Sequence, residues 1–116
     1  MISSYKNLHV WQKGMKLCED IYLVTKQFPT TEMYGLISQI RRCCVSIPSN
    51  IAEGNARGSK LEYKHFLSIA FASAAELETQ LILSKRIGYI KERDFEKLLM
   101  QLEEIIKMLN SLGNSL

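Results

Sequence analysis

The sequence predicts an all-α fold, an up-down-up-down antiparallel four-helix bundle. Two observations predict it: apolar residues recur at intervals of three and four in four segments, and only short turn sequences separate these segments. Short connections make consecutive helices antiparallel neighbours. The chain has 116 residues, which suits one domain. We therefore expect a single domain, 1–116, with helices over about 8–28, 32–56, 60–87 and 92–112.

The first predicted helix carries two apolar rows, and Asn7 is its expected N-cap. One row has the alternating four- and three-residue spacing of a bundle seam and consists of Val10, Gly14, Leu17, Ile21, Val24 and Phe28. The second row lies beside it and consists of Trp11, Met15, Cys18 and Tyr22. This second row either packs against another helix of the same bundle or meets another subunit. Pro29 is expected to end the helix.

An apolar row also runs through the second predicted helix, which we expect Thr30 or Thr31 to cap. Its members are Leu36, Ile40, Cys43, Ile47 and Ile51. Pro48 lies inside this pattern, where it cannot donate a backbone hydrogen bond and its ring crowds the preceding turn. Because the periodicity continues past the proline, we expect a kink at Pro48 rather than a helix end. Gly54 and Gly58 are expected to weaken and then end the helix.

A polar row runs beside the apolar row of the second helix. Either it is a solvated face, or it forms a partly buried network between helices or subunits, since buried charges need partners. Glu76 and Gln80 lie beside the seam of the third helix and are candidates to face it. The candidate members of the network are Arg42, Ser46, Ser49, Asn50, Glu53 and Glu76.

The third and fourth helices have clear boundaries in the sequence. Ser59 and Glu62 form a capping box at the start of the third helix, and Gly88 is expected to end it. The inner face of this helix consists of Phe66, Ala70, Ser73 or Ala74, Leu77, Leu81 and Ser84, whose small members let a neighbour approach closely. The fourth seam is the cleanest and consists of Phe95, Leu98, Leu102, Ile105, Leu109 and Leu112. Gly113 is expected to close it.

The net charge is +3, from 15 basic and 12 acidic residues. Four cationic residues are grouped around the second turn, and two more lie on the first helix. They are Arg41, Arg57, Lys60 and Lys64, with Lys13 and Lys16. Such residues either form a solvated face or contact the phosphates of a nucleic acid, with salt-dependent and weakly sequence-specific affinity.

Motifs for catalysis, metals and cofactors are missing from the sequence. Glu62 and His65 have the spacing of a di-iron ligand pair, but no second pair of this kind accompanies them. No glycine-rich phosphate loop and no plausible nucleophile–base pair is present. Cys18, Cys43 and Cys44 lack the spacing of a zinc site and are expected to be buried as small hydrophobes. We expect neither an enzyme nor a metal or other cofactor.

The sequence also predicts a cytoplasmic protein. We find no apolar run that approaches the ~20 residues of a membrane span. The N-terminal segment MISSYKNLHVW lacks the basic region and apolar core of a signal peptide. No membrane partner is therefore expected.

The segment QIRRCCVSIPSNIAEG, residues 39–54, closely resembles the signature of a small four-helix-bundle family named for proteins encoded in 23S rRNA intervening sequences. The matching block is long and contains an unusual mid-helix SIPSNIAEG. The resemblance continues through LHVW at 8–11, FLSIAFASAAEL at 66–77 and LSKRIGYI at 83–90. It covers nearly the whole chain.

This resemblance implies a homo-oligomer, expected to be a pentamer because characterised relatives form five-fold barrels. It also implies a link to RNA or DNA, since family members are encoded within rRNA intervening sequences. Similar proteins are accessory factors of diversity-generating retroelements and bind a reverse transcriptase and nucleic acid. Two hypotheses follow: an oligomeric nucleic-acid-binding module, or a protein scaffold or reverse-transcriptase accessory factor with no independent nucleic-acid role.

Overall fold

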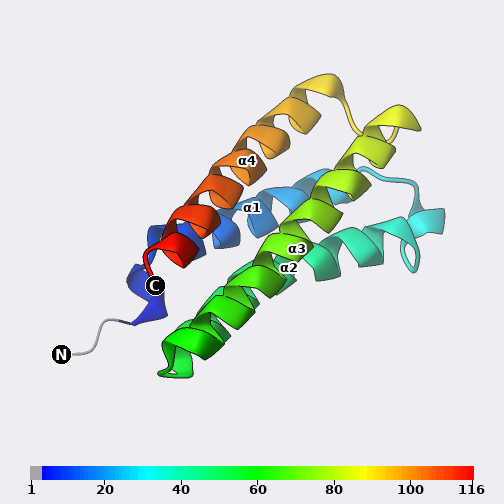
Figure 1. Ribbon diagram of the computed structural model, residues 1–116. Helices are drawn as coiled ribbons and strands as arrows, with labels where there is room; N and C mark the ends of the chain where they lie inside the picture. Colours follow the sequence, from blue (N-terminus) through cyan, green and yellow to red (C-terminus); the bar gives the residue numbers. More distant parts are fainter. Residues whose placement is uncertain (1–3) are drawn as a thin grey trace.

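The computed structural model describes residues 4–116, so the first three residues of the predicted domain lie outside the description. Within that range it contains four α-helices, two short 3-10 helices and no strand. The α-helices are α1 (His9–Thr25), α2 (Leu36–Ala56), α3 (Lys60–Arg86) and α4 (Glu92–Asn114), and the 3-10 helices are Tyr5–Asn7 and Thr30–Glu32. Figure 1 shows successive helices running in opposite directions, with α4 returning beside α1. The predicted all-α four-helix bundle is confirmed.

The apolar core lies between the four helices and is built largely from the predicted rows, although Ile37, Leu67 and Ile90 are buried outside those rows. The predicted members Leu36, Phe66 and Leu112 are only partly buried. Its largest fully buried apolar side chains are Leu17, Ile21, Ile40, Ile47, Ile51, Leu77, Leu81, Leu98, Leu102 and Ile105. Cys18, Cys43 and Cys44 are free thiols and are buried, as the sequence predicted. The spacing of apolar residues identified the core because residues three and four apart share one helix face.

The second apolar row of α1 divides between the core and the surface. Cys18 is buried and Trp11 is partly buried against the core. Met15 and Tyr22 keep 39% and 41% of their surface exposed. Part of the row therefore packs within the chain, and part is left uncovered.

The first helix starts within one residue of its predicted start, but its predicted N-cap and its predicted end are wrong. Asn7 lies in a 3-10 helix, and Leu8 is the N-cap of α1, without a side-chain hydrogen bond. The helix ends at Thr25, whose hydroxyl donates to the carbonyl of Ile21 at 2.7 Å. Phe28 is buried beyond the helix end, so its place in the apolar row reflects burial rather than helical structure.

The predicted start of the second helix is also wrong, because Thr30 and Thr31 lie in a 3-10 helix instead of capping α2. Gly35 is the N-cap, and the Glu32 carboxylate accepts a hydrogen bond from the backbone N–H of Leu36 at 3.3 Å. A Cβ on Gly35 would lie 2.9 Å from Glu32 Oε1. Glycine therefore leaves room for the carboxylate that satisfies the first turn of the helix.

The middle of α2 contains Pro48, which is buried, and the helix is continuous on both sides of it. The proline lies against α1 at Gly14, where an added Cβ would stand 3.5 Å from the proline ring. The small residue on α1 thus accommodates the ring on α2. The kink at Pro48 stays a prediction.

The turn between α2 and α3 follows the predicted pattern. Gly58 has a φ of +80°, a conformation that suits glycine. Ser59 Oγ accepts from the backbone N–H of Glu62 at 3.1 Å, which confirms the serine as the N-cap of α3.

The end of α3 also agrees with the sequence. Gly88 has a φ of +84°, and its N–H donates to the carbonyl of Lys85 at 3.1 Å. The N–H of Tyr89 donates to the carbonyl of Ser84 at 2.9 Å, which completes a Schellman motif. By contrast, α4 continues through Gly113 to Asn114, so the predicted closure at Gly113 is wrong.

Candidate nucleic-acid interface

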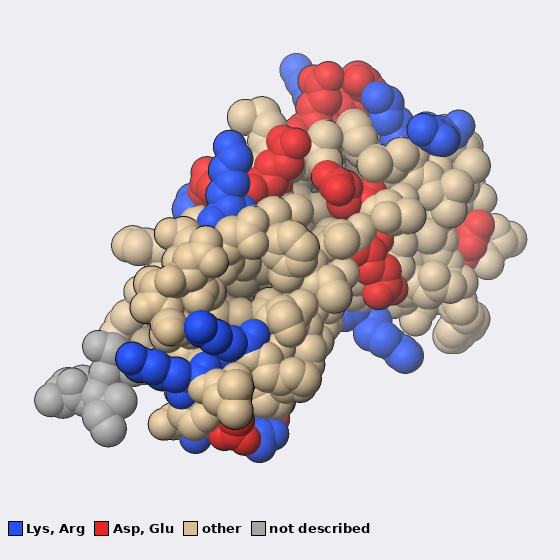
Figure 2. All heavy atoms as spheres, viewed as in Figure 1, with Lys and Arg blue, Asp and Glu red and all other residues tan. Residues whose placement is uncertain are grey.

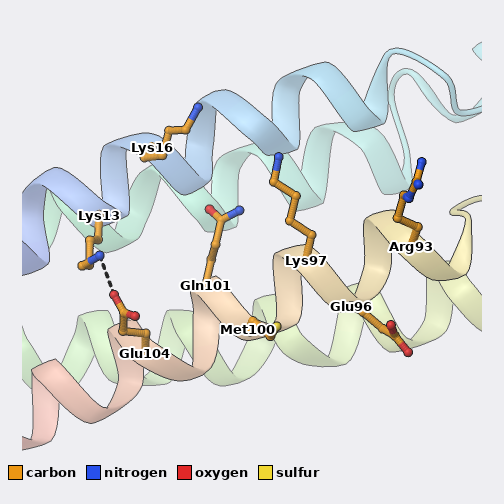
Figure 3. Close-up of a pocket in the computed structure, with 8 residues that line it drawn as sticks. All are labelled: Lys13, Lys16, Arg93, Glu96, Lys97, Met100, Gln101 and Glu104. Atoms are coloured by element: carbon orange, nitrogen blue, oxygen red, sulfur yellow. Dashed lines mark ion pairs between the residues drawn. The ribbon is translucent and has the colours of Figure 1, made fainter.

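A hollow of about 540 Å³ lies between α1 and α4, and we call it the α1–α4 groove. Its lining consists of Lys13, Lys16, Arg93, Glu96, Lys97, Met100, Gln101 and Glu104. Four of these side chains are cationic and two are acidic. The groove brings together the two predicted lysines of the first helix and two cations of α4, Arg93 and Lys97, that were not among the predicted residues (Figure 3).

The two α1 lysines are held by carboxylates. Lys13 Nζ lies 2.5 Å from Glu104 Oε1, and both side chains are about half exposed. Lys16 Nζ lies 3.2 Å from Asp20 Oδ1, a carboxylate whose side chain is only 8% exposed. Gln101 Nε2 donates to the other Asp20 oxygen at 3.0 Å, so the buried charge has partners on both helices.

The two α4 cations are not held in this way. Among residues 4–116, neither Arg93 nor Lys97 forms an ion pair within 4.0 Å. Both side chains point toward α1 in Figure 3, whereas Glu96 points away from α1. These two cations are therefore free to meet an anion in the groove.

The basic turn, defined as Arg57, Lys60 and Lys64, is a separate region at the end of α2 and the start of α3. The Arg57 guanidinium lies 2.8 Å from Glu53 Oε2 and 3.8 Å from Glu62 Oε1. Its hydrogen bond to Glu53 raises the pKa of the guanidinium. Two carboxylates thus already surround the central cation of this turn.

Arg41 lies apart from both regions. Its Nε donates to Thr25 Oγ1 at 2.9 Å, and its guanidinium stacks over the Tyr22 ring with 4.5 Å to the centroid. The structure therefore divides the six predicted phosphate-contacting residues among the groove, the basic turn and this stacked position.

The predicted polar network is only partly a network in this chain. Ser46 and Ser73 hydroxyls lie 2.8 Å apart, and Asn50 Nδ2 donates to Ser46 Oγ at 2.9 Å. This cluster links α2 with α3. Arg42 and Glu76 line one hollow of about 510 Å³ without pairing within 4.0 Å in the described chain.

The other two predicted members lie outside the serine–asparagine cluster. Ser49 is exposed, and Glu53 forms an ion pair with Arg57. Ser49 and Glu53 are therefore not part of the polar cluster between α2 and α3 in this single chain.

The thiols are protected by burial and hydrogen bonds. Cys43 Sγ donates to the carbonyl of Ser73 at 3.0 Å, and burial, with a smaller contribution from the charge of Glu76, raises its pKa to about 12. The pKa of Cys44 is also raised, first by a hydrogen bond with the Cys18 thiol and then by burial. Within residues 4–116, no group of three or more His, Cys, Asp or Glu side chains gathers as metal ligands would.

The outward side of α3 is largely apolar. We define the outer α3 face as the exposed residues Ser68, Phe71, Ala72, Ala75, Thr79, Ile82 and Leu83, which share one side of the helix at 3.6-residue periodicity. It carries no charge, and Glu76 and Glu78 lie at its two edges. In Figure 2 the surface along the middle of α3 is uncharged, with acidic side chains beside it and basic side chains near the lower end of the helix.

The composition of α3 corrects the expectation that no apolar run approaches a membrane span. By length and composition, α3 is the one helix in the described chain that is long and apolar enough to cross a membrane. Core helices of other proteins meet the same criterion. In this chain, however, only 33% of the apolar stretch of α3 that meets this criterion is buried.

Comparison with known proteins agrees with the resemblance found in the sequence. The sequence model of the 23S rRNA-intervening sequence protein family matches residues 6–111. A crystal structure of a protein of unknown function from the S23 ribosomal protein family of Bacteroides thetaiotaomicron is similar, with a TM-score of 0.81 and 28% identity. The match covers 90% of this chain and 97% of that one. A comparison with curated proteins finds no match. The chain belongs to the 23S rRNA-intervening sequence protein family.

Proposed function

We propose that the protein is a non-enzymatic, self-associating nucleic-acid-binding module. The observation that carries the proposal is the α1–α4 groove, a concave surface lined by four cations and only two carboxylates. Concave cationic surfaces attract the phosphate backbone and release counterions when it binds. Repetition of the groove around an oligomer multiplies this attraction, so the small net charge of +3 per chain does not argue against it.

The outer α3 face is the surface we propose for self-association. A long apolar helix is normally buried, yet α3 is covered on only part of its circumference. Phe71 and Ile82 supply bulk, and Ala72 and Ala75 between them leave room for a neighbouring helix. The expected number of five subunits comes from the family resemblance.

A second candidate, a protein scaffold or reverse-transcriptase accessory factor, is favoured by one surface. Hollows of about 510 and 360 Å³ share Tyr34, Ser38 and Arg42 in their linings. Tyr34 is 97% exposed. Exposed tyrosine and arginine are typical anchors of protein–protein interfaces.

Light-scattering mass, measured with and without a mixed-sequence RNA at low and moderate salt, tests the proposal. We expect about five times the chain mass of 13.3 kDa, with RNA taken up at low salt and released as salt rises. Replacing Lys13, Arg93 and Lys97 by Gln should abolish RNA uptake and preserve the oligomer; Lys16 is kept because it pairs with the buried Asp20 carboxylate. In the matched control, Arg57, Lys60 and Lys64 are replaced by Gln. This control should retain most of the RNA uptake of the wild type.

Contrary outcomes separate the two candidate functions. An oligomer indifferent to RNA at low salt would favour the scaffold. A monomer would contradict self-association, and an oligomer unchanged by Phe71→Glu would remove the outer α3 face as its interface. If only the basic-turn control lost RNA binding, the binding site would be the basic turn rather than the groove.

A further inference from the structure

The lining of the α1–α4 groove offers charge without a means of reading bases. None of its eight residues is aromatic, so no ring is available for a base to stack on. The one amide, Gln101, already donates to the buried Asp20 carboxylate at 3.0 Å. The remaining uncharged residue is Met100, which is 71% exposed. What the groove can recognise is therefore a chain of negative charge.

Its free cations have the geometry for such a chain. Arg93 and Lys97 are four residues apart on one helix, which is about 6 Å along the axis of α4 at 1.5 Å per residue. Figure 3 shows both side chains directed toward α1 along the same edge of the groove. Successive phosphates of one strand could contact them in turn.

The α1 lysines are less available, and to different degrees. The Lys13–Glu104 pair is half exposed, and exposed pairs are weak, so a phosphate can displace Glu104. Lys16 neutralises a carboxylate that is 8% exposed, and moving Lys16 away would leave that buried charge with fewer partners. The groove thus has two free cations on α4, one weakly held lysine and one firmly held lysine.

We infer that the α1–α4 groove binds a bare phosphate chain, with Arg93 and Lys97 as its binding cations and with neither base nor sugar recognised. This inference rests on the proposed nucleic-acid-binding function. Glu104 moderates the affinity by occupying Lys13, and Asp20 positions Lys16 and Gln101 without contacting the ligand. A groove of this kind accepts RNA, DNA and inorganic polyphosphate alike.

Fluorescence anisotropy of a labelled mixed-sequence single-stranded RNA, measured from 50 to 200 mM salt, tests the inference. Arg93→Gln/Lys97→Gln should weaken binding roughly tenfold at 50 mM salt and flatten the log K against log salt slope by about 1.4 per engaged groove. Lys13→Gln/Lys16→Gln should change binding about threefold or less. The control Lys26→Gln/Lys107→Gln, which removes two exposed cations outside the groove lining, should have the wild-type affinity.

Two further measurements define the ligand. DNA of the same sequence should bind within about threefold of RNA, and inorganic polyphosphate should displace both. Glu104→Gln frees Lys13 and should raise RNA affinity about threefold with a steeper salt slope. Because Lys16→Gln can destabilise the fold through Asp20, Lys13→Gln alone is measured as a second variant. Thermal melting checks that every variant is folded.

The outcomes distinguish a failure of the phosphate-chain site from a failure of the proposed nucleic-acid-binding function. If the wild type binds no RNA at any salt concentration, the proposed function fails. If it binds RNA but Arg93→Gln/Lys97→Gln binds equally well, or polyphosphate does not compete, the function stands and the inference is overturned. A strong preference among RNA sequences would equally overturn it, because a bare phosphate-chain site has no means of base discrimination.

Discussion

The α2–α3 side and the α1–α4 side of the bundle are built differently. Where α2 meets α3, Gly54 lies so close to its neighbour that an added Cβ would stand 2.8 Å from Phe66 Cβ and 3.3 Å from the Tyr63 carbonyl oxygen. Ala70 and Ala74 of α3 are fully buried. Where α1 meets α4, long charged side chains line a hollow of about 540 Å³ instead.

Side-chain size explains this difference. Glycine, alanine and serine let two backbones approach, which buries the apolar rows and allows short hydrogen bonds such as Ser46 to Ser73 at 2.8 Å. Lysine, arginine and glutamate keep their charged ends in water and leave a concave surface between the helices. One side of the bundle therefore stabilises the fold, and the other remains available for a ligand.

The largest expected contrast between the two sides is in thiol reactivity. Cys43, in the α2–α3 interface, has its pKa raised to about 12, whereas a cysteine introduced by Met100→Cys in the exposed groove should have a pKa near the ordinary ~8.5. Alkylation at pH 8, followed by peptide mass analysis, should label the introduced thiol on the order of a hundredfold faster than Cys43. Equal rates would show that the α2–α3 interface opens readily.

The raised pKa of Cys43 also predicts how stability depends on pH. The folded state holds the proton more tightly than the unfolded state does, so this contribution to stability is fully present below the unfolded pKa of ~8.5. It is lost as the pH rises from there toward 12. Denaturant unfolding between pH 8 and pH 10.5 should show falling stability, and Cys43→Ala should show a smaller fall.

Gly54→Ala should have the largest effect on stability among small substitutions. The new Cβ would overlap Phe66 Cβ, an atom fixed near the backbone, so α2 and α3 must separate. We expect the free energy of unfolding to fall by about 2 kcal/mol in urea denaturation. Gly113→Ala is the matched control, since nothing lies within 4 Å of its added Cβ, and it should stabilise α4 by about 0.5 kcal/mol. Similar effects at the two glycines would contradict the close approach.

Ser73→Ala should have a smaller effect in the same interface. It removes the hydrogen bond between the Ser73 and Ser46 hydroxyls, while Asn50 continues to donate to Ser46. A loss of about 1 kcal/mol is expected from urea unfolding. No measurable change would mean that water replaces the lost hydroxyl and that this interface is more open than the hydrogen bond indicates.

Substitutions in the groove should affect stability least. Glu104→Gln breaks the half-exposed pair with Lys13, and such pairs contribute about 0–1 kcal/mol. Urea unfolding should therefore differ from the wild type by less than about 0.5 kcal/mol. A larger loss of unfolding free energy would show that the groove residues stabilise the fold, and it would weaken the proposal that the groove is a ligand surface.

The predicted polar residues show where sequence periodicity stops being informative. The row from Arg42 to Glu53 is on one side of α2 as expected, but its members meet different partners: Ser46 bonds to Ser73, and Glu53 to Arg57. Spacing along one helix gives the side on which a residue lies. It does not give the residue across the interface.

Sequence periodicity was enough to predict the four helices, most of their buried rows, the buried cysteines and the glycine turns at Gly58 and Gly88. These depend on contacts within a few residues and on the 3.6-residue period, both of which are local. Two features emerge only from the folded chain: Lys13 and Lys16 line one groove with Arg93 and Lys97, and Glu32 rather than Thr30 or Thr31 supports the start of α2. Such contacts depend on how helices distant in the chain are rotated against one another, and side-chain size across the whole interface fixes that rotation.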